Sequence, residues 1–389
     1  MKQLNIGLVG AGFVGKLHAL AQAAMPMFFW PAPAMPVRKM IAEATEDLAR
    51  EAALRFGFER HTADWRKLVE DPAIQVVAIA TPNDQHAEIA IAAAAAGKHI
   101  LCEKPLGRDA AEAKRMLDAV ERAGVVNMVG HQFRRTPAVA FARKLIDEGA
   151  IGRILSCRGT YLQDFGADPD VPLLWRFRKS VAGSGALGDI GSHALDMLRY
   201  LVGEVAAVHA VARTYVHERP LPQPGQTTIP IPGSAPRRDA PTGRVDVDDE
   251  VLAMLRFTNG AVGSLEASRN AFGRLNFLTF EIHGDRGALC FNYERRDELQ
   301  VFFADDPVDR RGFRTVYTGP AHPYGEYWPI AGIGIGYGDT KVMEYYDFVK
   351  AVAEGTAVSP SFRDGYRIAQ VCDAILESAD RRSWVELPS

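Results

Sequence analysis

Three residues in one short stretch have the types and spacing that acid–base chemistry needs. Asp189, His193 and Asp196 follow a glycine-rich run that begins at Gly183. If a helix begins near Asp189, the three side chains share one of its faces. Asp189 as a simple helix cap would leave His193 unexplained, and a metal site here would lack further ligands nearby. We therefore favour acid–base chemistry beside a bound cofactor, with no metal.

A lysine occupies a second position where chemistry is expected. Glu103-Lys104-Pro105 directly follows the apolar stretch His99–Cys102, which is typical of a buried strand. The carboxyl ends of parallel strands are where open α/β sheets bind ligands. A lysine close to a cationic nicotinamide ring would lose its proton more readily than a free one. The alternative is an ordinary solvated lysine in a surface turn.

A glycine-rich turn near the start of the chain predicts a dinucleotide site. Gly10-Ala11-Gly12-Phe13-Val14-Gly15 follows the first predicted strand and opens a helix. In this pattern the first glycine permits a tight turn and the second lets a pyrophosphate approach the backbone. The third lets helix and strand pack closely, and the helix N-terminus attracts the phosphates.

Glu43 predicts which dinucleotide binds. It ends the second predicted strand, where a carboxylate binds the ribose hydroxyls and repels the 2′-phosphate of NADP. Ala44-Thr45 supply no compensating cation. Glu43 lies farther from Gly15 than the usual ~20 residues because the apolar, proline-rich segment Met25–Pro36 intervenes. The sequence therefore favours NAD, with NADP as the alternative.

The elements that must position these residues alternate in the first third of the chain. Short apolar runs alternate with Ala- and Leu-rich helical patterns, which predicts an α/β domain with a doubly wound parallel sheet. The predicted strands are Leu4–Val9, Arg38–Ala42, Val76–Ala80, His99–Cys102 and Val125–Val129. The predicted helices are Glu46–Arg55, His86–Ala96 and Ala110–Ala123.

After about residue 150 longer strands linked by short turns predict a second, α+β domain with a large, open, mainly antiparallel sheet. Its predicted strands are Arg153–Tyr161, Val205–Val216, Glu250–Phe257, Ala261–Ser268, Leu278–His283 and Ala288–Tyr293. Its predicted helices are Asp189–Leu201, Lys341–Glu354 and Gly365–Ser378. We place the boundary at residue 130, with a dinucleotide-binding domain over 1–130 and a substrate and oligomerisation domain over 131–389. The last helices are expected to pack back toward the first domain.

Two proline-rich segments interrupt these patterns. Met25–Pro36 is expected to pack over the first domain, or else to line a pocket or a subunit contact. Pro220–Gly243 is too rich in proline for a helix or strand, and we predict a long irregular loop that acts as an oligomer arm.

The composition excludes several functional classes. The 389 residues carry 45 basic and 48 acidic side chains, a net charge of −3, so a basic nucleic-acid footprint is absent. No apolar run reaches the ~20 residues that span a bilayer, and the N-terminus shows no signal-peptide pattern. The four cysteines are scattered along the chain. These features predict a soluble cytoplasmic protein with free thiols and neither a membrane nor a nucleic-acid partner.

Three motifs in this order resemble the Gfo/Idh/MocA oxidoreductases. They are the glycine-rich turn, Glu103-Lys104-Pro105 and Asp189-x-x-x-His193, and the similarity spans essentially the whole chain. Thr81-Pro82-Asn83 with His86 and the closing Asp373–Ser378 support it. Met25–Pro36, Tyr161–Asp164 and Pro320–Gly325 are similar to bacterial sugar 3-dehydrogenases within the family. His131-Gln132-Phe133 departs from the Asn and Tyr that relatives often carry there, which bears on the substrate.

The resemblance implies a Rossmann domain followed by a sheet domain that often forms dimers or tetramers. It implies a catalytic set, a cofactor-binding set and a substrate-binding set. The catalytic residues would be Lys104, Asp189 and His193. The cofactor would contact Gly10, Gly12, Phe13, Val14, Gly15, Glu43, Thr81, Pro82, Asn83, His86, Glu103, Lys104, Gln132, Trp175 and Arg176. The substrate would contact Lys104, Tyr161, Gln163, Asp164, Trp175, Arg176, Asp189, His193 and His322.

The implied reaction is oxidation of a secondary hydroxyl, at C3, of a sugar, an anhydrosugar such as levoglucosan or a cyclitol, with hydride transfer to NAD. His193 is our choice of base and Lys104 would stabilise the alkoxide, although the two roles can be exchanged. One alternative is an NAD-assisted glycosidase that oxidises C3 only transiently. The other is a cofactor-binding regulator without catalysis, which retention of Lys104, Asp189 and His193 disfavours.

Overall fold

The chain folds into two compact units. The computed structural model describes residues 2–223, 240–330 and 332–388. The first unit comprises residues 1–137 and 319–367, and the second comprises residues 138–318 and 368–389. Residues 319–367 were predicted to belong to the later domain, but in the structure they carry a helix that packs within the first unit.

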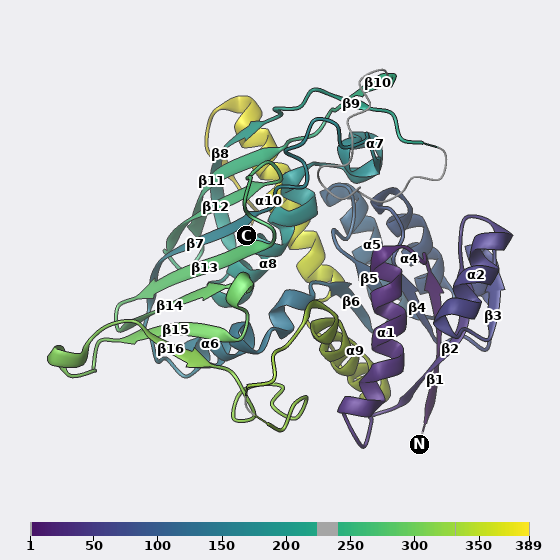
Figure 1. The fold of residues 1–389 in the computed structure, drawn as a ribbon, viewed down its shortest axis with the longest axis horizontal. Helices are drawn as coiled ribbons and strands as arrows, with labels where there is room; N and C mark the ends of the chain where they lie inside the picture. The colour runs from purple at the N-terminus through teal and green to yellow at the C-terminus, as the bar shows by residue number, and fades with distance from the viewer. Residues whose placement is uncertain (1, 224–239, 331, 389) are drawn as a thin grey trace. The chain divides into compact units, whose positions relative to one another are not determined.

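The first unit is built on a parallel sheet of six strands in the order β3-β2-β1-β4-β5-β6 (Figure 1). The strands are β1 Gln3–Val9, β2 Met35–Ala42, β3 Arg60–Thr62, β4 Val76–Ile79, β5 His99–Glu103 and β6 Asn127–Gly130. The helices are α1 Phe13–Phe28, α2 Glu46–Phe56, α3 Trp65–Glu70, α4 His86–Ala95, α5 Ala110–Ala123 and α9 Tyr337–Glu354, with short turns η1 Asn83–Gln85 and η2 Gln132–Arg135. This is the predicted doubly wound sheet, and its strand order reverses between β1 and β4, where such sheets bind nucleotides.

All five strands predicted for this sheet occur, and the prediction missed only its edge strand β3. β1 is buried on both faces, as expected for a parallel sheet that helices cover. α1 and α9 pack side by side, and so do α4 and α5 (Figure 1). The sequence therefore predicted the central strands well, because long apolar runs mark them.

The irregular segment between α1 and β2 is shorter than the predicted insertion Met25–Pro36. α1 continues through Pro26 to Phe28, and β2 already begins at Met35. Phe28 stacks on Tyr327 with ring centroids 4.1 Å apart, and Phe29 stacks on Tyr346 at 4.0 Å. The segment thus packs into the core of the first unit, as the plainer of the two interpretations predicted.

The second unit is built on a nine-stranded sheet in the order β16-β15-β14-β13-β7-β12-β11-β8-β17 (Figure 1). The strands are β7 Ile154–Leu162, β8 Val205–Arg213, β11 Glu250–Phe257, β12 Val262–Ser268, β13 Phe277–Gly284, β14 Gly287–Asn292, β15 Glu298–Phe303, β16 Arg314–Tyr317 and β17 Val385–Glu386. A separate ribbon pairs β9 Glu218–Pro220 with β10 Thr242–Arg244. All ladders of the large sheet are antiparallel except that of β7 with β12.

Helices and short turns complete the second unit. They are α6 Pro137–Asp147, η3 Trp175–Phe177, α7 Lys179–Ala182, η4 Leu187–Gly191, α8 Ser192–Leu201, η5 Tyr293–Arg295, η6 Val308–Arg310 and α10 Phe362–Arg381; α6 and α10 each begin in the first unit. α8 packs against β7, β12 and β13. Along β11 buried and exposed residues alternate, so the opposite face of the sheet is open to solvent.

Pro220–Gly243 is described only at its two ends. Pro220 and Thr242 pair in the ribbon of β9 and β10. Residues 224–239 lie outside the described residues, so the predicted oligomer arm stays a prediction. Among the helices that the structure describes, none is both long and apolar enough to cross a membrane.

Candidate active site

The glycine-rich turn joins β1 to α1 with the geometry that a dinucleotide requires. Gly10 has φ +96°, a left-handed conformation that favours glycine, and a Cβ there would lie 2.6 Å from the carbonyl oxygen of Ala80. A Cβ on Gly15 would lie 2.1 Å from the Gly10 oxygen. A Cβ on Gly12, the helix N-cap, would meet nothing within 4 Å. The turn is thus closed toward β4 and open at the helix N-terminus, where a phosphate is expected.

Glu43 lies against this turn from the end of β2. Its Oε1 accepts a hydrogen bond of 2.5 Å from the amide of Ala11, and its Oε2 accepts one of 2.9 Å from the amide of Ala44. Beside the same turn, the hydroxyl of Thr81 is buried and has no hydrogen-bond partner among the described residues. Predicted cofactor residues from β1, β2 and β4 therefore meet at one edge of the sheet.

His86 connects the end of β4 to the turn that follows β5. Its ring nitrogens lie 3.0 Å from the carbonyl oxygens of Thr81 and Pro105. Complete burial lowers the pKa of His86, although both carbonyl groups favour the protonated ring. In the structure the buried ring of His86 connects the loop after β4 to the turn after β5 through hydrogen bonds. Its contact with a cofactor stays a prediction.

Glu103, next to Lys104, is held by a buried network that the sequence did not indicate. Its Oε1 lies 2.9 Å from Nε2 of His18 on α1 and 2.6 Å from Nζ of Lys341 on α9. Burial alone would raise the pKa of Glu103, but the charge of Lys341 and the hydrogen bond with His18 bring it well below its ordinary value. Glu103, the residue directly before Lys104, is thus held as an anion.

The network continues away from Glu103 along α1 and α9. Lys341 also lies 2.5 Å from Oε2 of Glu344, and His18 Nδ1 lies 2.7 Å from the hydroxyl of Tyr345. Burial lowers the pKa of His18. Two helices that are far apart in the sequence therefore fix the turn that carries Lys104.

Two further predicted residues belong to the first unit. Gln132 lies buried in η2 and hydrogen-bonds with Tyr337, whose pKa burial raises. His322 accepts a hydrogen bond of 3.1 Å from the amide of Gly319 through Nδ1. His322 therefore shapes its own loop, and a role in substrate binding stays a prediction.

In the second unit Tyr161 and Gln163 converge on Asn276. The hydroxyl of Tyr161 donates to Oδ1 of Asn276 at 2.6 Å, and Nε2 of Gln163 donates to the same oxygen at 3.3 Å. The ring of Tyr161 lies 6.1 Å from that of His193. Asn276 was missed because nothing in its local sequence marks it. Asp164 is partly buried just beyond Gln163.

Asp189 and His193 lie in consecutive helical turns of different kinds. The sequence predicted one helix from Asp189, but Asp189 lies in η4, a π-helical turn, and α8 begins at Ser192. π-helical turns are rare in proteins, and many of those that occur lie at functional sites. Ser192 Oγ donates to the carbonyl oxygen of Gly188 at 2.7 Å, which satisfies a backbone acceptor inside the turn.

Asp189 faces two guanidinium groups. Its Oδ2 lies 3.7 Å from Nε of Arg176, in η3, and 3.6 Å from Nη1 of Arg269, directly after β12. The guanidinium of Arg176 also lies over the ring of Trp175, 4.3 Å from its centroid. The sequence singled out Arg176 but missed Arg269, because the residue reaches Asp189 from a distant strand end.

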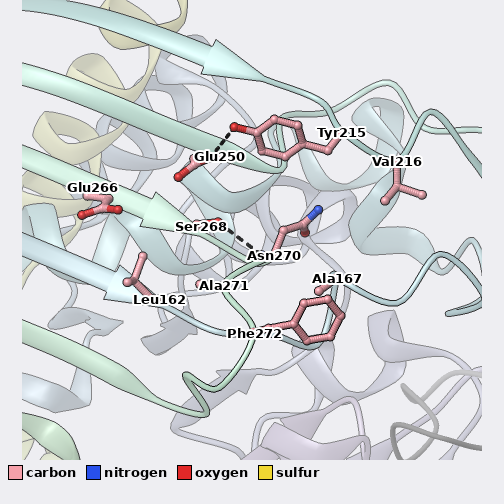
Figure 2. Close-up of a pocket in the computed structure, with 10 residues that line it drawn as sticks. All are labelled: Leu162, Ala167, Tyr215, Val216, Glu250, Glu266, Ser268, Asn270, Ala271 and Phe272. Carbon is pink, nitrogen blue, oxygen red and sulfur yellow. Dashed lines mark hydrogen bonds between the residues drawn. The ribbon is translucent and has the colours of Figure 1, made fainter.

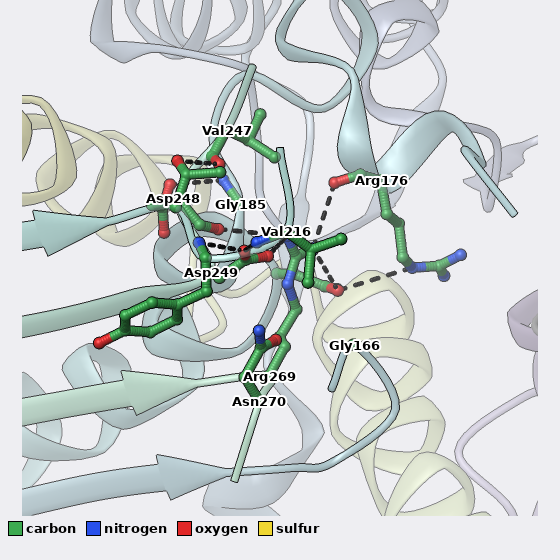
Figure 3. Close-up of polar contacts among 12 residues, drawn as sticks. Gly166, Arg176, Gly185, Val216, Val247, Asp248, Asp249, Arg269 and Asn270 are labelled. Carbon is green, nitrogen blue, oxygen red and sulfur yellow. Dashed lines mark hydrogen bonds and ion pairs between the residues drawn. The ribbon is translucent and has the colours of Figure 1, made fainter. Parts of the chain in front are cut away.

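The loop before Asp189 is held by Asp248. Its two carboxylate oxygens accept from the amides of Gly185 at 2.7 Å and Leu187 at 2.8 Å (Figure 3). A Cβ on Gly185 would lie 1.7 Å from the Asp248 carbonyl oxygen, so only glycine fits. The glycine-rich run is thus explained by close backbone packing around the π-helical turn.

A hollow of about 340 Å³ lies elsewhere in the second unit, at the ends of β7, β11 and β12 (Figure 2). None of the predicted site residues lines it. Its lining residues are Leu162, Ala167, Tyr215, Val216, Glu250, Glu266, Ser268, Asn270, Ala271 and Phe272. Leu162 and Tyr161 are neighbours on a strand, so they face opposite sides of the sheet. The hollow is therefore on the open face, away from His193.

The described residues contain no group of three or more His, Cys, Asp or Glu side chains that fits a metal ion.

Two family models match the chain. Residues 4–131 match the one described as "Oxidoreductase family, NAD-binding Rossmann fold". Residues 139–290 match the one described as "GFO/IDH/MocA C-terminal domain".

Several known proteins resemble the chain over its full length. A levoglucosan dehydrogenase of Pseudarthrobacter phenanthrenivorans is 65% identical over 389 residues, covering 100% of this chain and 99% of that protein. A myo-inositol 2-dehydrogenase of Thermotoga maritima is 27% identical over 385 residues, covering 99% and 98%. The structure of a levoglucosan dehydrogenase in complex with NADH and levoglucosan matches with a TM-score of 0.94 at 64% identity, covering 100% of both chains.

Proposed function

Because the chain belongs to the GFO/IDH/MocA family of NAD-binding oxidoreductases, we propose that it is an NAD-dependent dehydrogenase of levoglucosan or a closely related sugar or cyclitol. Oxidation of a secondary hydroxyl, at C3, would give the ketone. The observation that carries the proposal is the 65% identity with a levoglucosan dehydrogenase over the whole chain. The family assignment confirms the resemblance drawn from the three ordered motifs.

The residues of the first unit fit NAD. The open N-terminus of α1 at Gly12 provides amide groups for a pyrophosphate. Glu43 is fixed at the end of β2 and would accept hydrogen bonds from the adenosine ribose. The unpartnered hydroxyl of Thr81 lies at the same edge of the sheet. NAD, when bound, accepts the hydride from the carbinol carbon.

The proposal assigns three side chains to one reaction. His193 takes the hydroxyl proton as the hydride leaves, and Asp189 orients His193 or shares the proton. Lys104 donates a hydrogen bond to the hydroxyl and stabilises the developing alkoxide. Glu103, directly before Lys104, is fixed by its pairs with His18 and Lys341 and so holds the turn that carries Lys104. In the alternative assignment Lys104 takes the proton and His193 stabilises the alkoxide, with the same residues in the site.

The proposal is tested by following NADH absorbance with NAD and a panel of levoglucosan, glucose, myo-inositol and aryl glucosides. We expect stoichiometric NADH with levoglucosan, little activity with NADP, and a loss of roughly 10²–10⁴ in kcat for His193→Ala and Lys104→Ala. Binding of NAD to both variants is the control for folding. Release of phenol from an aryl glucoside without net NADH would instead establish the NAD-assisted glycosidase.

We further propose that a second copy of the chain covers the open face of the nine-stranded sheet, giving a dimer or tetramer. Leu252 and Met254 on β11 and Val262 on β12 project from this face, each about half exposed. Val211 on β8 pairs with Leu252 and extends the same apolar strip. Exposed apolar patches of this kind mark protein–protein contacts.

We also propose a cytoplasmic location. All four cysteines are free thiols, and three of them are buried. Free buried thiols are typical of proteins in a reducing compartment such as the cytoplasm, which also contains NAD.

A further inference from the structure

The carboxylate of Asp189 pairs with two guanidinium groups, whereas backbone amides hold the carboxylates of Asp248 and Asp249. Asp248 accepts two backbone hydrogen bonds, and Asp249 accepts two from the amides of Tyr215 and Val216, at 2.8 and 3.0 Å. Asp189 forms ion pairs through Oδ2 with Arg176 and Arg269. Its charge is therefore balanced by side chains that reach it from two other segments.

The two arginines differ in how firmly they are held. The side chain of Arg176 is about a quarter exposed, whereas that of Arg269 is fully buried. Nη1 of Arg269 donates to the carbonyl oxygen of Arg176 at 3.1 Å, and Nη2 donates to that of Asp248 at 3.2 Å (Figure 3). The guanidinium also lies 4.8 Å from the centroid of Phe177. Arg269 thus has one fixed position.

In that position Arg269 links two segments that lead to Asp189. Through Arg176 it holds η3, and through Asp248 it holds the loop whose amides at Gly185 and Leu187 lead into the π-helical turn. Arg176 from η3 and Arg269 from the end of β12 face Asp189, and His193 follows it four residues later, on α8. Asp249 lies 3.9 Å from the other terminal nitrogen of Arg269.

We propose that Arg269 is a positioning residue that keeps Asp189 ionised and fixed, so that the substrate's hydroxyl proton passes to a neighbouring base and never to Asp189. Two cations at one carboxylate oxygen stabilise the anion strongly in a partly buried site. A carboxylate held in this way is a poor proton acceptor but an effective partner for an imidazolium. This inference rests on the proposed dehydrogenase function, and it decides between the two roles left open for Asp189.

The first experiment compares the pH dependence of kcat for the wild type and Arg269→Gln. We expect kcat to fall roughly 10²-fold, as displaced catalytic groups do, with the KM for NAD unchanged. The acid limb of the wild-type profile should reflect one proton. In Arg269→Gln the acid limb should become steeper, because the loss of one of the two cations makes Asp189 easier to protonate. A profile parallel to that of the wild type would overturn the proposal.

Arg219→Lys is the matched control. Arg219 is also fully buried and lies 4.1 Å from the centroid of Phe177, but it donates to the carbonyl oxygens of Gly166 and Asp168. This variant should lower the melting temperature and leave the shape of the pH profile unchanged. The same steepening in Arg219→Lys would show that any disturbed packing produces it, and would overturn the assignment to Arg269.

A double-mutant cycle covers the case in which Arg269→Gln does not fold. Arg269→Lys keeps the charge but not the paired hydrogen bonds, and it should lower kcat in the wild-type background but not in Asp189→Asn. Equal losses in both backgrounds would contradict action through Asp189.

The melting temperatures of the same four proteins give a readout that needs no substrate. The changes in melting temperature caused by the two single substitutions should not add up to the change in the double variant if the two residues are coupled. Additive changes would overturn the coupling. If the wild type forms no NADH, the proposed function fails while this cycle still decides whether Arg269 acts on Asp189.

Discussion

At the scale of single residues, the positions of the motifs could be predicted from the sequence. The residues that hold the motif side chains in place could not. Gly10, Lys104 and Asp189 stand in patterns whose spacing carries the chemistry. Lys341 and Arg269 reach the same places from segments more than 75 positions away along the chain. No local pattern marks such residues, because only the folded chain gives them their partners.

Glu43 leads to a prediction about cofactor choice. Glu43→Gln keeps an acceptor for the amide of Ala11 but removes the charge that repels a 2′-phosphate. We expect the preference for NAD over NADP, measured as the ratio of kcat/KM values, to shrink by about 10-fold or more, since hydrogen bonds to a charged group contribute about 1.5–3 kcal/mol.

The matched control for this prediction is Glu46→Gln, an exposed acid three positions later. It should leave the ratio unchanged. An unchanged ratio in Glu43→Gln as well would mean that Glu43 does not select the cofactor.

At the scale of elements, the long apolar strands were predicted and the irregular turns were not. β11 was placed correctly to the residue, whereas β15 and β16, which carry more polar residues, were missed. The π-helical turn at η4 was taken for ordinary helix, because propensity does not distinguish the two. Tertiary contacts with Asp248 fix it instead.

The buried network that joins β5, α1 and α9 leads to a prediction about stability and pH. Glu103→Gln should lower the free energy of unfolding by roughly 3 kcal/mol near neutral pH, because it removes one partner of a buried pair. The folded-state pKa of Glu103 is depressed, so its contribution is present above the unfolded pKa of about 4.3 and is lost as the pH falls below it. The difference in melting temperature between wild type and variant should therefore narrow between about pH 7 and about pH 3.5.

Glu88→Gln is the control for this measurement, because Glu88 is well exposed and pairs with Arg66 at the surface. It should change the melting temperature little at either pH. A difference for Glu103→Gln that stays constant with pH would mean that Glu103 does not stabilise the fold as an anion.

At the scale of the whole molecule, assembly depends on the open face of the large sheet. A charge at Met254, in the centre of its apolar strip, should dissociate the proposed oligomer. Met254→Glu should shift the mass measured by light scattering from a dimer or tetramer to a monomer, with the unit still folded. The control Val308→Glu places the same charge at another exposed apolar position, in η6, and should leave the mass unchanged. A wild-type protein that is monomeric at all concentrations would refute the interface.

The central claim is that a hydride passes from C3 of an anhydrosugar to NAD on this chain. The most direct measurement uses levoglucosan deuterated at C3 and determines the mass of the NADH that forms. We predict NADH that carries the deuterium, a slower rate than with unlabelled substrate, and a rate roughly 10²–10⁴ lower in Lys104→Ala. Unlabelled NADH would place the oxidation at another carbon, and no NADH at all would contradict the assignment as a levoglucosan dehydrogenase.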